Sequence, residues 1–468
     1  MIKRDLASKL PLDYVLKYKI LPMKEYEEVV EFACSSSHEE TLLIQSLEFI
    51  FGKKVIFSLM NIEKLERVIG IYYGYDIFLE GRTDIKLSEH PTISLYHFLI
   101  NNAIESNASD IHIEPKKDGV LIRYRINGSL VLANYLEEKY YKGLIQRLKA
   151  LGGMNIAEKR IPQDGKLQYE YKNRNMNVRI STIPVYHGEK MVMRLLNAEE
   201  KVIDFEALAF QEHQKELILK MMCHNHGIIL VTGPTGSGKS STLYSIINRL
   251  KREDINISTV EDPVEILIEG INQTNINNKA GLTFSLGLRS LLRQDPDIIM
   301  IGEIRDEETA KTAIRAAVTG HLVLSTLHTN DVFSVLTRLQ DMGIEDYLVK
   351  DALIGSISQR LIKCLCIKCR EKIDKTGYYA AIGCKACNYT GYSGRIIISE
   401  ALYFPEFYSL ENNNGADVIR RRYREKYGNQ MLANLISFYK KGVIDYKEFM
   451  LYKVECLDGD DDIHYEGT

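Results

Sequence analysis

The sequence predicts an α/β protein whose larger part is built on a parallel sheet. From about residue 209 onward, short apolar runs alternate with amphipathic segments, which is typical of parallel strands joined by helices. Before that point, residues 92–197 alternate apolar and polar positions and contain an Asn127–Gly128 turn, which predicts antiparallel hairpins. At 468 residues the chain is also too long for one ordinary core. We therefore expect several domains.

The composition excludes several classes of protein. Hydrophobic residues make up 45% and charged residues 26%, as in folded proteins rather than disordered ones. Lys and Arg number 60 against 63 Asp and Glu, so nothing in the net charge favours binding to nucleic acid. No apolar run reaches the roughly 18–20 residues of a membrane span, and the charged N-terminus has no signal-peptide core. We expect a cytosolic protein without a membrane span.

The first 91 residues carry no catalytic motif and predict a small α/β adaptor. KEYEEVVEFA (24–33) has apolar positions at helical spacing and predicts a helix, whereas KKVIFSL (53–59) predicts a strand. Residues 92–197 then predict a compact α+β domain that opens with a helix in SLYHFLINNAIESN. The charged segment 198–208 predicts a linker.

Residues 209–468 form the predicted α/β domain, with four short apolar strands. These are GIILVTG (227–233), INISTVE (255–261), DIIMIGE (297–303) and HLVLSTL (321–327). The first runs directly into a segment that fits G-x-x-x-x-G-K-[ST] and precedes an amphipathic run. Its residues are Gly233, Pro234, Thr235, Gly236, Ser237, Gly238, Lys239 and Ser240, followed by Ser241. Such a loop wraps backbone N–H groups around phosphate at a helix N-terminus. Lys239 would contact the β/γ-phosphates, and the Ser240 hydroxyl would bind Mg²⁺.

Hydrolysis requires further groups beside the phosphates. The apolar run Ile298–Ile301 leads into Gly302 and Glu303, and would deliver Glu303 to the phosphate edge of the sheet. The alternative is that Glu303 only caps a strand. Many nucleoside triphosphatases have Asp where this chain has Gly302. We therefore expect Glu261 and Asp262 to supply the carboxylates that help to hold the metal.

Two histidines, His321 and His328, flank the strand LVLST. A lone histidine is usually structural. Here two histidines lie at the ends of one strand, and that strand follows the one that leads into Glu303. This arrangement favours a role for both histidines in sensing the γ-phosphate.

Five of the eight cysteines crowd into positions 364–387. Cys366 and Cys369 form one C-x₂-C pair, and Cys384 and Cys387 form another, with 14 residues between the pairs. Four thiolates complete a tetrahedral site with no position left for water, which predicts structural Zn²⁺. The fifth cysteine, Cys364, is either a competing ligand or an ordinary spare cysteine.

Long motifs in the chain resemble the secretion ATPases, and more narrowly the assembly motors of type II secretion and type IV pili. The stretches GPTGSGKSSTLY, TVEDPVE, LRSLLRQDPDIIMIGEIRDEETA and GHLVLSTLHTND resemble the family's Walker A, Asp box, Walker B and His box. The segments ASDIHIEP, RYRING, MNIAEKRIPQDGKLQ and VRISTIPVYHGEKMVMRLL resemble its second N-terminal domain, which has a PAS-like fold. The zinc element (364–395) resembles the tetracysteine element of the assembly ATPases.

The resemblance implies a RecA-like ATPase domain in a homohexameric ring that binds ATP, Mg²⁺ and Zn²⁺. It implies that Glu303 is the catalytic glutamate and that Glu261 helps to hold Mg²⁺ and water. Arginines of the PAS-like domain would complete a neighbouring nucleotide site, and Arg179 and Arg194 match best. Further candidates are Arg123, Arg125 and Arg160. Ordinary surface charge is the alternative for all five.

The function implied by the resemblance is to power assembly of pilin or pseudopilin subunits at an inner-membrane platform protein, from the inner face of the cell membrane. A type II secretion motor and a DNA-uptake motor stay open as alternatives. A retraction motor, a RecA-like DNA motor and a catalytically silent scaffold are less favoured. The first 91 residues lack the repeats by which some relatives bind cyclic di-GMP, and we expect them to dock onto a membrane-associated partner.

Overall fold

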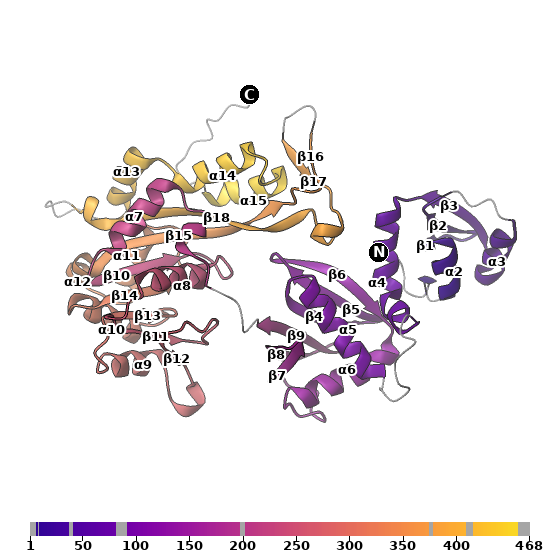
Figure 1. Ribbon diagram of the computed structural model, residues 1–468, viewed down its shortest axis with the longest axis horizontal. Coiled ribbons are helices and arrows are strands. Elements are labelled where there is room, and N and C mark those ends of the chain that lie inside the picture. The colour runs from indigo at the N-terminus through magenta and orange to yellow at the C-terminus, as the bar shows by residue number, and fades with distance from the viewer. Residues whose placement is uncertain are drawn as a thin grey trace. The chain divides into compact units, whose positions relative to one another are not determined.

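The computed structural model describes residues 6–7, 9–36, 41–80, 91–196, 202–373, 378–408 and 415–456, without the side chains of 75–80 and 91. The chain divides into two compact units (Figure 1). The first comprises Met1–Ala198 with Cys384–Thr390, and the second Glu199–Gly383 with Gly391–Thr468. The predicted linker begins at residues 198–201, which lie outside the described residues.

The first unit opens with a small α/β layer. Its strands are β1 (Ile20–Glu25), β2 (Val29–Cys34) and β3 (Lys54–Leu59), and its helices α2 (Leu12–Tyr18), α3 (Thr41–Phe51) and α4 (Ile62–Glu80). Strand β2 lies between β1, to which it is antiparallel, and β3, to which it is parallel. The strand predicted at 53–59 is confirmed.

The helix predicted for residues 24–33 is wrong, because these residues end β1 and form most of β2. The N–H of Tyr26 donates to the carbonyl of Val29 and closes a turn between the strands. Val30 and Phe32 are fully buried, and the ring of Phe32 meets that of Phe51 edge-on at 5.3 Å. Packing of β-branched and aromatic side chains on a central strand outweighs the local helical spacing.

A six-stranded antiparallel sheet forms the rest of the first unit, in the order β6-β5-β4-β9-β8-β7. The strands are β4 (Ala108–Lys116), β5 (Gly119–Ile126), β6 (Ser129–Leu136), β7 (Gln163–Tyr171), β8 (Arg174–Val185) and β9 (Gly188–Leu196). Helices α5 (Pro91–Glu105) and α6 (Glu138–Leu151) share one core with one face of this sheet. Asn127 and Gly128 have φ angles of 49° and 82°, so the predicted hairpin turn is confirmed.

A seven-stranded sheet forms the centre of the second unit, in the order β12-β11-β13-β14-β10-β15-β18. The strands are β10 (Gly227–Thr232), β11 (Ile257–Glu261), β12 (Asn272–Asn275), β13 (Ile298–Ile301), β14 (Leu322–Leu327), β15 (Leu353–Leu365) and β18 (Tyr392–Tyr403). All neighbours are parallel except β18, which is antiparallel to β15. The four predicted strands and the α/β fold class are confirmed.

Helices cover both faces of this sheet. They are α7 (Glu212–Met222), α8 (Lys239–Leu250), α9 (Phe284–Leu291), α10 (Glu307–Val318), α11 (Ser334–Asp341), α12 (Asp346–Ala352), α13 (Ala416–Tyr427), α14 (Gln430–Lys440) and α15 (Tyr446–Cys456). Short elements are β16 (Arg370–Lys372), β17 (Tyr379–Ala381) and the 3₁₀ turns η1 (Phe205–Ala207), η2 (Asn278–Ala280), η3 (Lys385–Cys387) and η4 (Phe404–Glu406). Phe205 is 1% exposed, so the end of the predicted linker is packed into this unit.

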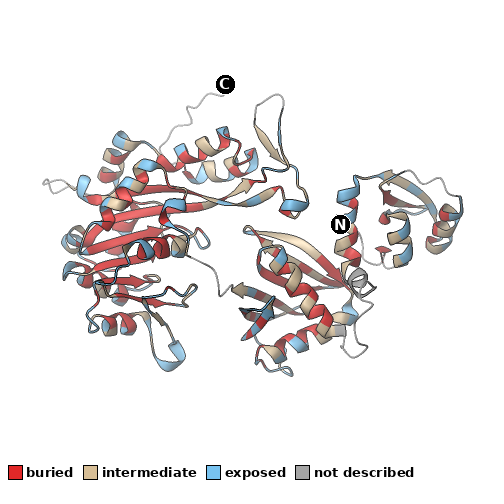
Figure 2. Ribbon diagram, viewed as in Figure 1, coloured by how far each residue is buried: buried red, intermediate tan, exposed pale blue. Residues whose placement is uncertain are grey.

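The central strands are buried on both faces, as the red ribbons of Figure 2 show. In β10, Ile228 and Leu230 enter the core on one side, and Ile229 and Val231 enter the core on the other. A strand buried on both sides is held in register, so its carboxyl end is fixed at the sheet edge. Among the described residues, none of the helices has both the length and the apolar character that a bilayer crossing requires.

Candidate nucleotide and metal sites

The loop Gly233–Gly238 joins the buried strand β10 to helix α8. Gly233, Gly236 and Gly238 have φ angles of 138°, 80° and 88°, which other residues rarely adopt. A Cβ at Gly233 would collide with the backbone carbonyl oxygen of Gln359. Helix α8 starts at Lys239, so its unsatisfied N–H groups face the loop. This arrangement fits the phosphates of a bound nucleotide.

Lys239 lies across this loop. Its ammonium group donates to the carbonyl oxygens of Gly233 at 2.8 Å and Pro234 at 3.0 Å. Burial lowers the pKa of Lys239, whereas the negative charge of Glu303 raises it. Ser240, the predicted magnesium ligand, is exposed in the first turn of α8. The residues present therefore fit Mg²⁺ with a triphosphate.

Glu303 follows β13, and the side chains of Arg305 and His328 hold its carboxylate. Arg305 Nη2 lies 2.5 Å from Oε1, and His328 Nε2 lies 3.4 Å from Oε2. Burial raises the pKa of Glu303, but Arg305 and His328 together hold that pKa below its usual value. Since β13, β14 and β10 are parallel neighbours, Glu303, His328 and the phosphate loop all follow carboxyl ends at the same sheet edge.

His321 does not reach this edge. It precedes β14, whereas His328 follows it, and the strand's six residues span about 20 Å. Its ring Nδ1 lies 3.0 Å from the carbonyl oxygen of Ala316, at the end of the sheet where β10 begins. One strand cannot bring both of its ends to one edge, so the structure pairs only His328 with Glu303.

Glu261, at the end of β11, is 4% exposed, and protein donors hold its carboxylate. Oε2 accepts a hydrogen bond from the hydroxyl of Tyr244. Oε1 accepts from Thr259 Oγ1 at 2.5 Å and from Gln273 Nε2 at 3.2 Å. The following residue, Asp262, is exposed.

The predicted arginines all belong to the first unit. Arg179 of β8 lies opposite Arg194 of β9, so their side chains share one sheet face. Arg194 Nε lies 2.9 Å from Asp110 Oδ1, and Arg125 Nε lies 3.5 Å from Asp110 Oδ2. Arg123 pairs with Glu114, and Arg160 with Glu158, both at 2.7 Å. That Arg179 or Arg194 reaches a neighbouring subunit stays a prediction.

Gln359, on β15, is a residue that the sequence reasoning missed. It is fully buried, and its Nε2 donates to the carbonyl of Ser237 at 2.8 Å. Its Oε1 accepts from Thr242 Oγ1 at 2.9 Å. Gln359 thereby braces the phosphate loop against α8. The available signal was weak, because β15 also carries the buried polar residues Ser356, Ser358 and Arg360.

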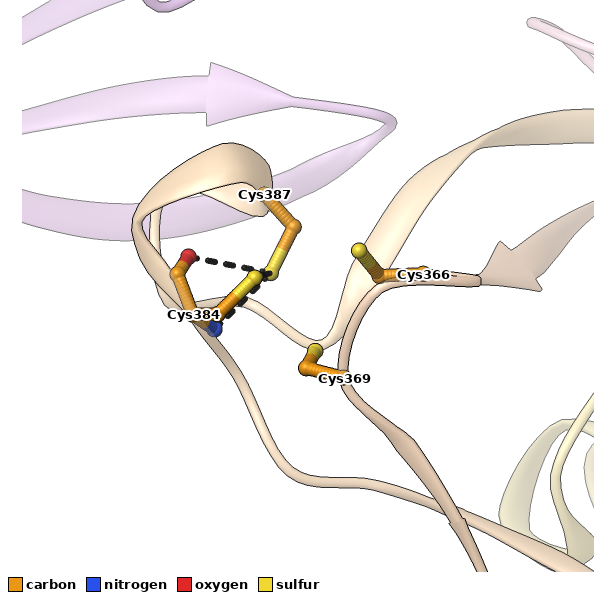
Figure 3. A group of neighbouring side chains, drawn as sticks. All are labelled: Cys366, Cys369, Cys384 and Cys387. Atoms are coloured by element: carbon orange, nitrogen blue, oxygen red, sulfur yellow. Dashed lines mark hydrogen bonds between the residues drawn. The ribbon is translucent and has the colours of Figure 1, made fainter.

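The four cysteines of the two C-x₂-C pairs come together (Figure 3). Their sulfurs all lie within 4.8 Å of one another. The hairpin β16–β17 joins the two pairs. The N–H of Gly383 donates to Cys369 Sγ at 3.3 Å, and that of Cys384 to Cys387 Sγ at 3.2 Å.

This donor set fits zinc. A tetrahedral Zn²⁺ with bonds of about 2.3 Å separates its sulfurs by about 3.8 Å, and backbone N–H donors stabilise thiolates. Cys366, Cys369, Cys384 and Cys387 would be the ligands. Cys364 is not in this group, which favours the interpretation that it is a spare cysteine.

We predict that Gln359→Leu destabilises the second unit by about 1–3 kcal/mol, because it leaves the Ser237 carbonyl and the Thr242 hydroxyl without their buried partner. Urea unfolding measures this change. The matched control is Gln340→Leu, an exposed glutamine on α11, which should change stability by less than about 0.5 kcal/mol. Equal effects of the two substitutions would contradict the bracing role.

We predict that Cys369→Ser removes bound zinc and lowers the melting temperature by at least about 5 °C, because the metal cross-links the two C-x₂-C pairs. Metal analysis and thermal melting on the same samples measure both effects. Cys364→Ser is the control and should keep zinc and melting unchanged. Unchanged melting after verified loss of zinc would exclude a structural metal.

Two family models match the chain. The model for type II/IV secretion system proteins matches residues 86–451, and the MshEN domain matches residues 1–77. The type II secretion system protein E of Dickeya dadantii is 46% identical over 340 residues, which cover 70% of this chain and 67% of that protein. The type IV pilus assembly ATPase PilB of Thermus thermophilus is 45% identical over 340 residues, which cover 69% of this chain and 38% of that protein.

A solved structure of a pilus motor is also similar to this chain. The pilus retraction motor PilT with bound ADP superposes with a TM-score of 0.51 at 27% identity, covering 76% of this chain and 96% of that one. The chain spans about two thirds of the length of the Dickeya protein and less than half of PilB. The chain thus belongs to the type II/IV secretion system protein family, as one of its ATPases.

Proposed function

We propose that this chain is a cytosolic, homohexameric motor that hydrolyses ATP to assemble pilin or pseudopilin subunits at an inner-membrane platform protein. The observation that carries the proposal is Glu303, held ionised by Arg305 and His328 at the sheet edge that carries the phosphate loop. A pilus assembly ATPase that is 45% identical over 340 residues supports the coupling to pilin assembly.

Each residue then has a part in hydrolysis. Bound Mg²⁺–ATP supplies the phosphoanhydride bond that is cleaved. Lys239 neutralises phosphate charge, and the Ser240 hydroxyl would hold the metal. The ionised Glu303 orients the attacking water and accepts its proton. In a ring, Arg179 and Arg194 would contribute positive charge to a neighbour's site.

The second candidate is a type II secretion motor. Relatives named type II secretion system protein E, one of them 46% identical over 340 residues, favour it. The two candidates use the same catalytic residues and differ only in the machinery that they drive. We place the motor at the inner face of the membrane, with residues 1–91 docked on a membrane-associated partner. A DNA motor is less favoured because the formal net charge is only −3.

We predict that Lys239→Ala, made at the native locus, abolishes the motor's output because a phosphate-binding charge is lost. Surface pili are counted by microscopy, and secreted proteins are profiled from the same culture. Lost pili with normal secretion identify a pilus assembly motor. Retained exoproteins with normal pili identify a type II secretion motor.

The biochemical control for this experiment is the purified Lys239→Ala chain, which should fold normally and hydrolyse no ATP. Normal ATP turnover in that variant would contradict the site assignment. If the variant lacks ATPase activity but both pili and secretion stay normal, that result would contradict both candidate functions. DNA uptake would then be tested.

We predict that Arg305→Gln moves the acid limb of the kcat/KM profile for ATP to higher pH. The active form of Glu303 is ionised, and its lowered pKa keeps that form present below the usual range of glutamate. Without Arg305, burial raises the pKa of Glu303, so activity is lost earlier as the pH falls. The control is Arg289→Gln, another exposed arginine in a carboxylate pair, and an equal shift there would contradict the argument.

A further inference from the structure

Tyr244 lies in α8, one helical turn after Ser240, and is 1% exposed. We propose that Tyr244 is a positioning residue for ATP hydrolysis, which sets the direction of the Glu261 carboxylate and links it to the first turn of α8. This inference rests on the proposed ATPase function. Tyr244 ends the stretch GPTGSGKSSTLY but has no role predicted from the sequence. The inference concerns how the Glu261 carboxylate is held in place.

The Tyr244 hydroxyl connects three segments of the second unit. It donates to Glu261 Oε2 at the end of β11, and it accepts the backbone N–H of Glu265 at 3.2 Å. The ring stands on α8, whose first residues are Lys239 and Ser240. One hydroxyl therefore joins three parts of the unit: helix α8, the predicted Mg²⁺ ligand Glu261, and the loop that contains Glu265.

The Tyr244 hydroxyl is the donor in this bond, because an ionised carboxylate oxygen can only accept. A protonated phenol facing a carboxylate makes a charge-assisted hydrogen bond, which is stronger than one between neutral groups.

The hydrogen bonds on Glu261 explain why this one donor matters. A carboxylate has about four acceptor positions on its two oxygens. Thr259 and Gln273 occupy those of Oε1, and Tyr244 occupies one of Oε2. The remaining acceptor position is on Oε2, and the Tyr244 hydroxyl fixes where it points.

Helix geometry couples this oxygen to the phosphate loop. Ser240 and Tyr244 are four residues apart, so they lie on one face of α8. The Tyr244 hydroxyl therefore bonds α8 directly to the Glu261 carboxylate. The two groups predicted to hold Mg²⁺, Ser240 and Glu261, are joined through a single side chain.

The test is Tyr244→Phe in the full-length chain, which removes only the hydroxyl. We expect kcat for ATP to fall about tenfold, corresponding to about 1.4 kcal/mol, with KM for ATP changed less than about twofold. The Mg²⁺ concentration that half-saturates the binding of ATP, measured by calorimetry without turnover, should also rise. The matched control is Tyr423→Phe, which removes a buried hydroxyl bonded to the Ala401 carbonyl at 3.0 Å and should keep kcat and the Mg²⁺ dependence.

A double-mutant cycle with Glu261→Gln tests whether Tyr244 acts through Glu261. We expect Tyr244→Phe to cost nothing further in the Glu261→Gln background. Additive losses, or an unchanged kcat and Mg²⁺ dependence in Tyr244→Phe, would overturn the inference. A wild-type chain that lacks ATPase activity would instead overturn the proposed function, and the inference with it.

A second variant keeps the inference testable if Tyr244→Phe does not fold. Glu261→Asp keeps the charge but draws the carboxylate back from the Tyr244 hydroxyl by one methylene. It should lower kcat with little change in KM, and an unchanged kcat would overturn the inference.

Discussion

The parallel register of β11, β13, β14 and β10 is the constraint on which the candidate nucleotide site depends. Their carboxyl ends meet at one edge, and each delivers one group to it: Glu261, Glu303, His328 and the phosphate loop. Apolar side chains on both faces of these strands hold that register, because a slip of one residue would disrupt their close packing in the two cores. The chemistry at the edge is therefore fixed by the packing of the core behind it.

The sequence predicted what is encoded locally. Strand β10, the glycines of its loop and each pair of cysteines lie within a few consecutive residues. Their patterns can therefore be recognised from the sequence alone. The helix expected at 24–33 was wrong because the middle position of β2 in its sheet, which is not local, decides the conformation. His321 was grouped with His328 because spacing along a chain does not say which sheet edge a residue occupies.

The supporting residues were missed because their partners are distant in sequence. Gln359 braces Ser237 across 122 residues, and Tyr244 meets Glu261 across 17. A polar side chain in a buried segment indicates that a partner exists, since an unpaired buried group is costly, but it does not identify that partner. The motif residues could thus be predicted, whereas the groups that hold them in place required the pairing of β15, β10 and β11.

Arg179 and Arg194 share one face of the sheet in the first unit. The contacts of Arg194 indicate how it could turn to a phosphate while the unit stays folded. The Arg194 side chain is 64% exposed, whereas that of Asp110 is 5% exposed, so the cost of separating the pair depends on the other partners of Asp110. Asp110 also accepts from Ser109 at 2.8 Å and pairs with Arg125, so it keeps partners when Arg194 leaves. A phosphate accepts two parallel hydrogen bonds from a guanidinium and competes well with a shared carboxylate. Release of Arg194 therefore leaves the buried Asp110 carboxylate with Ser109 and Arg125 as partners, which is how the first unit can keep its fold while Arg194 turns to a phosphate.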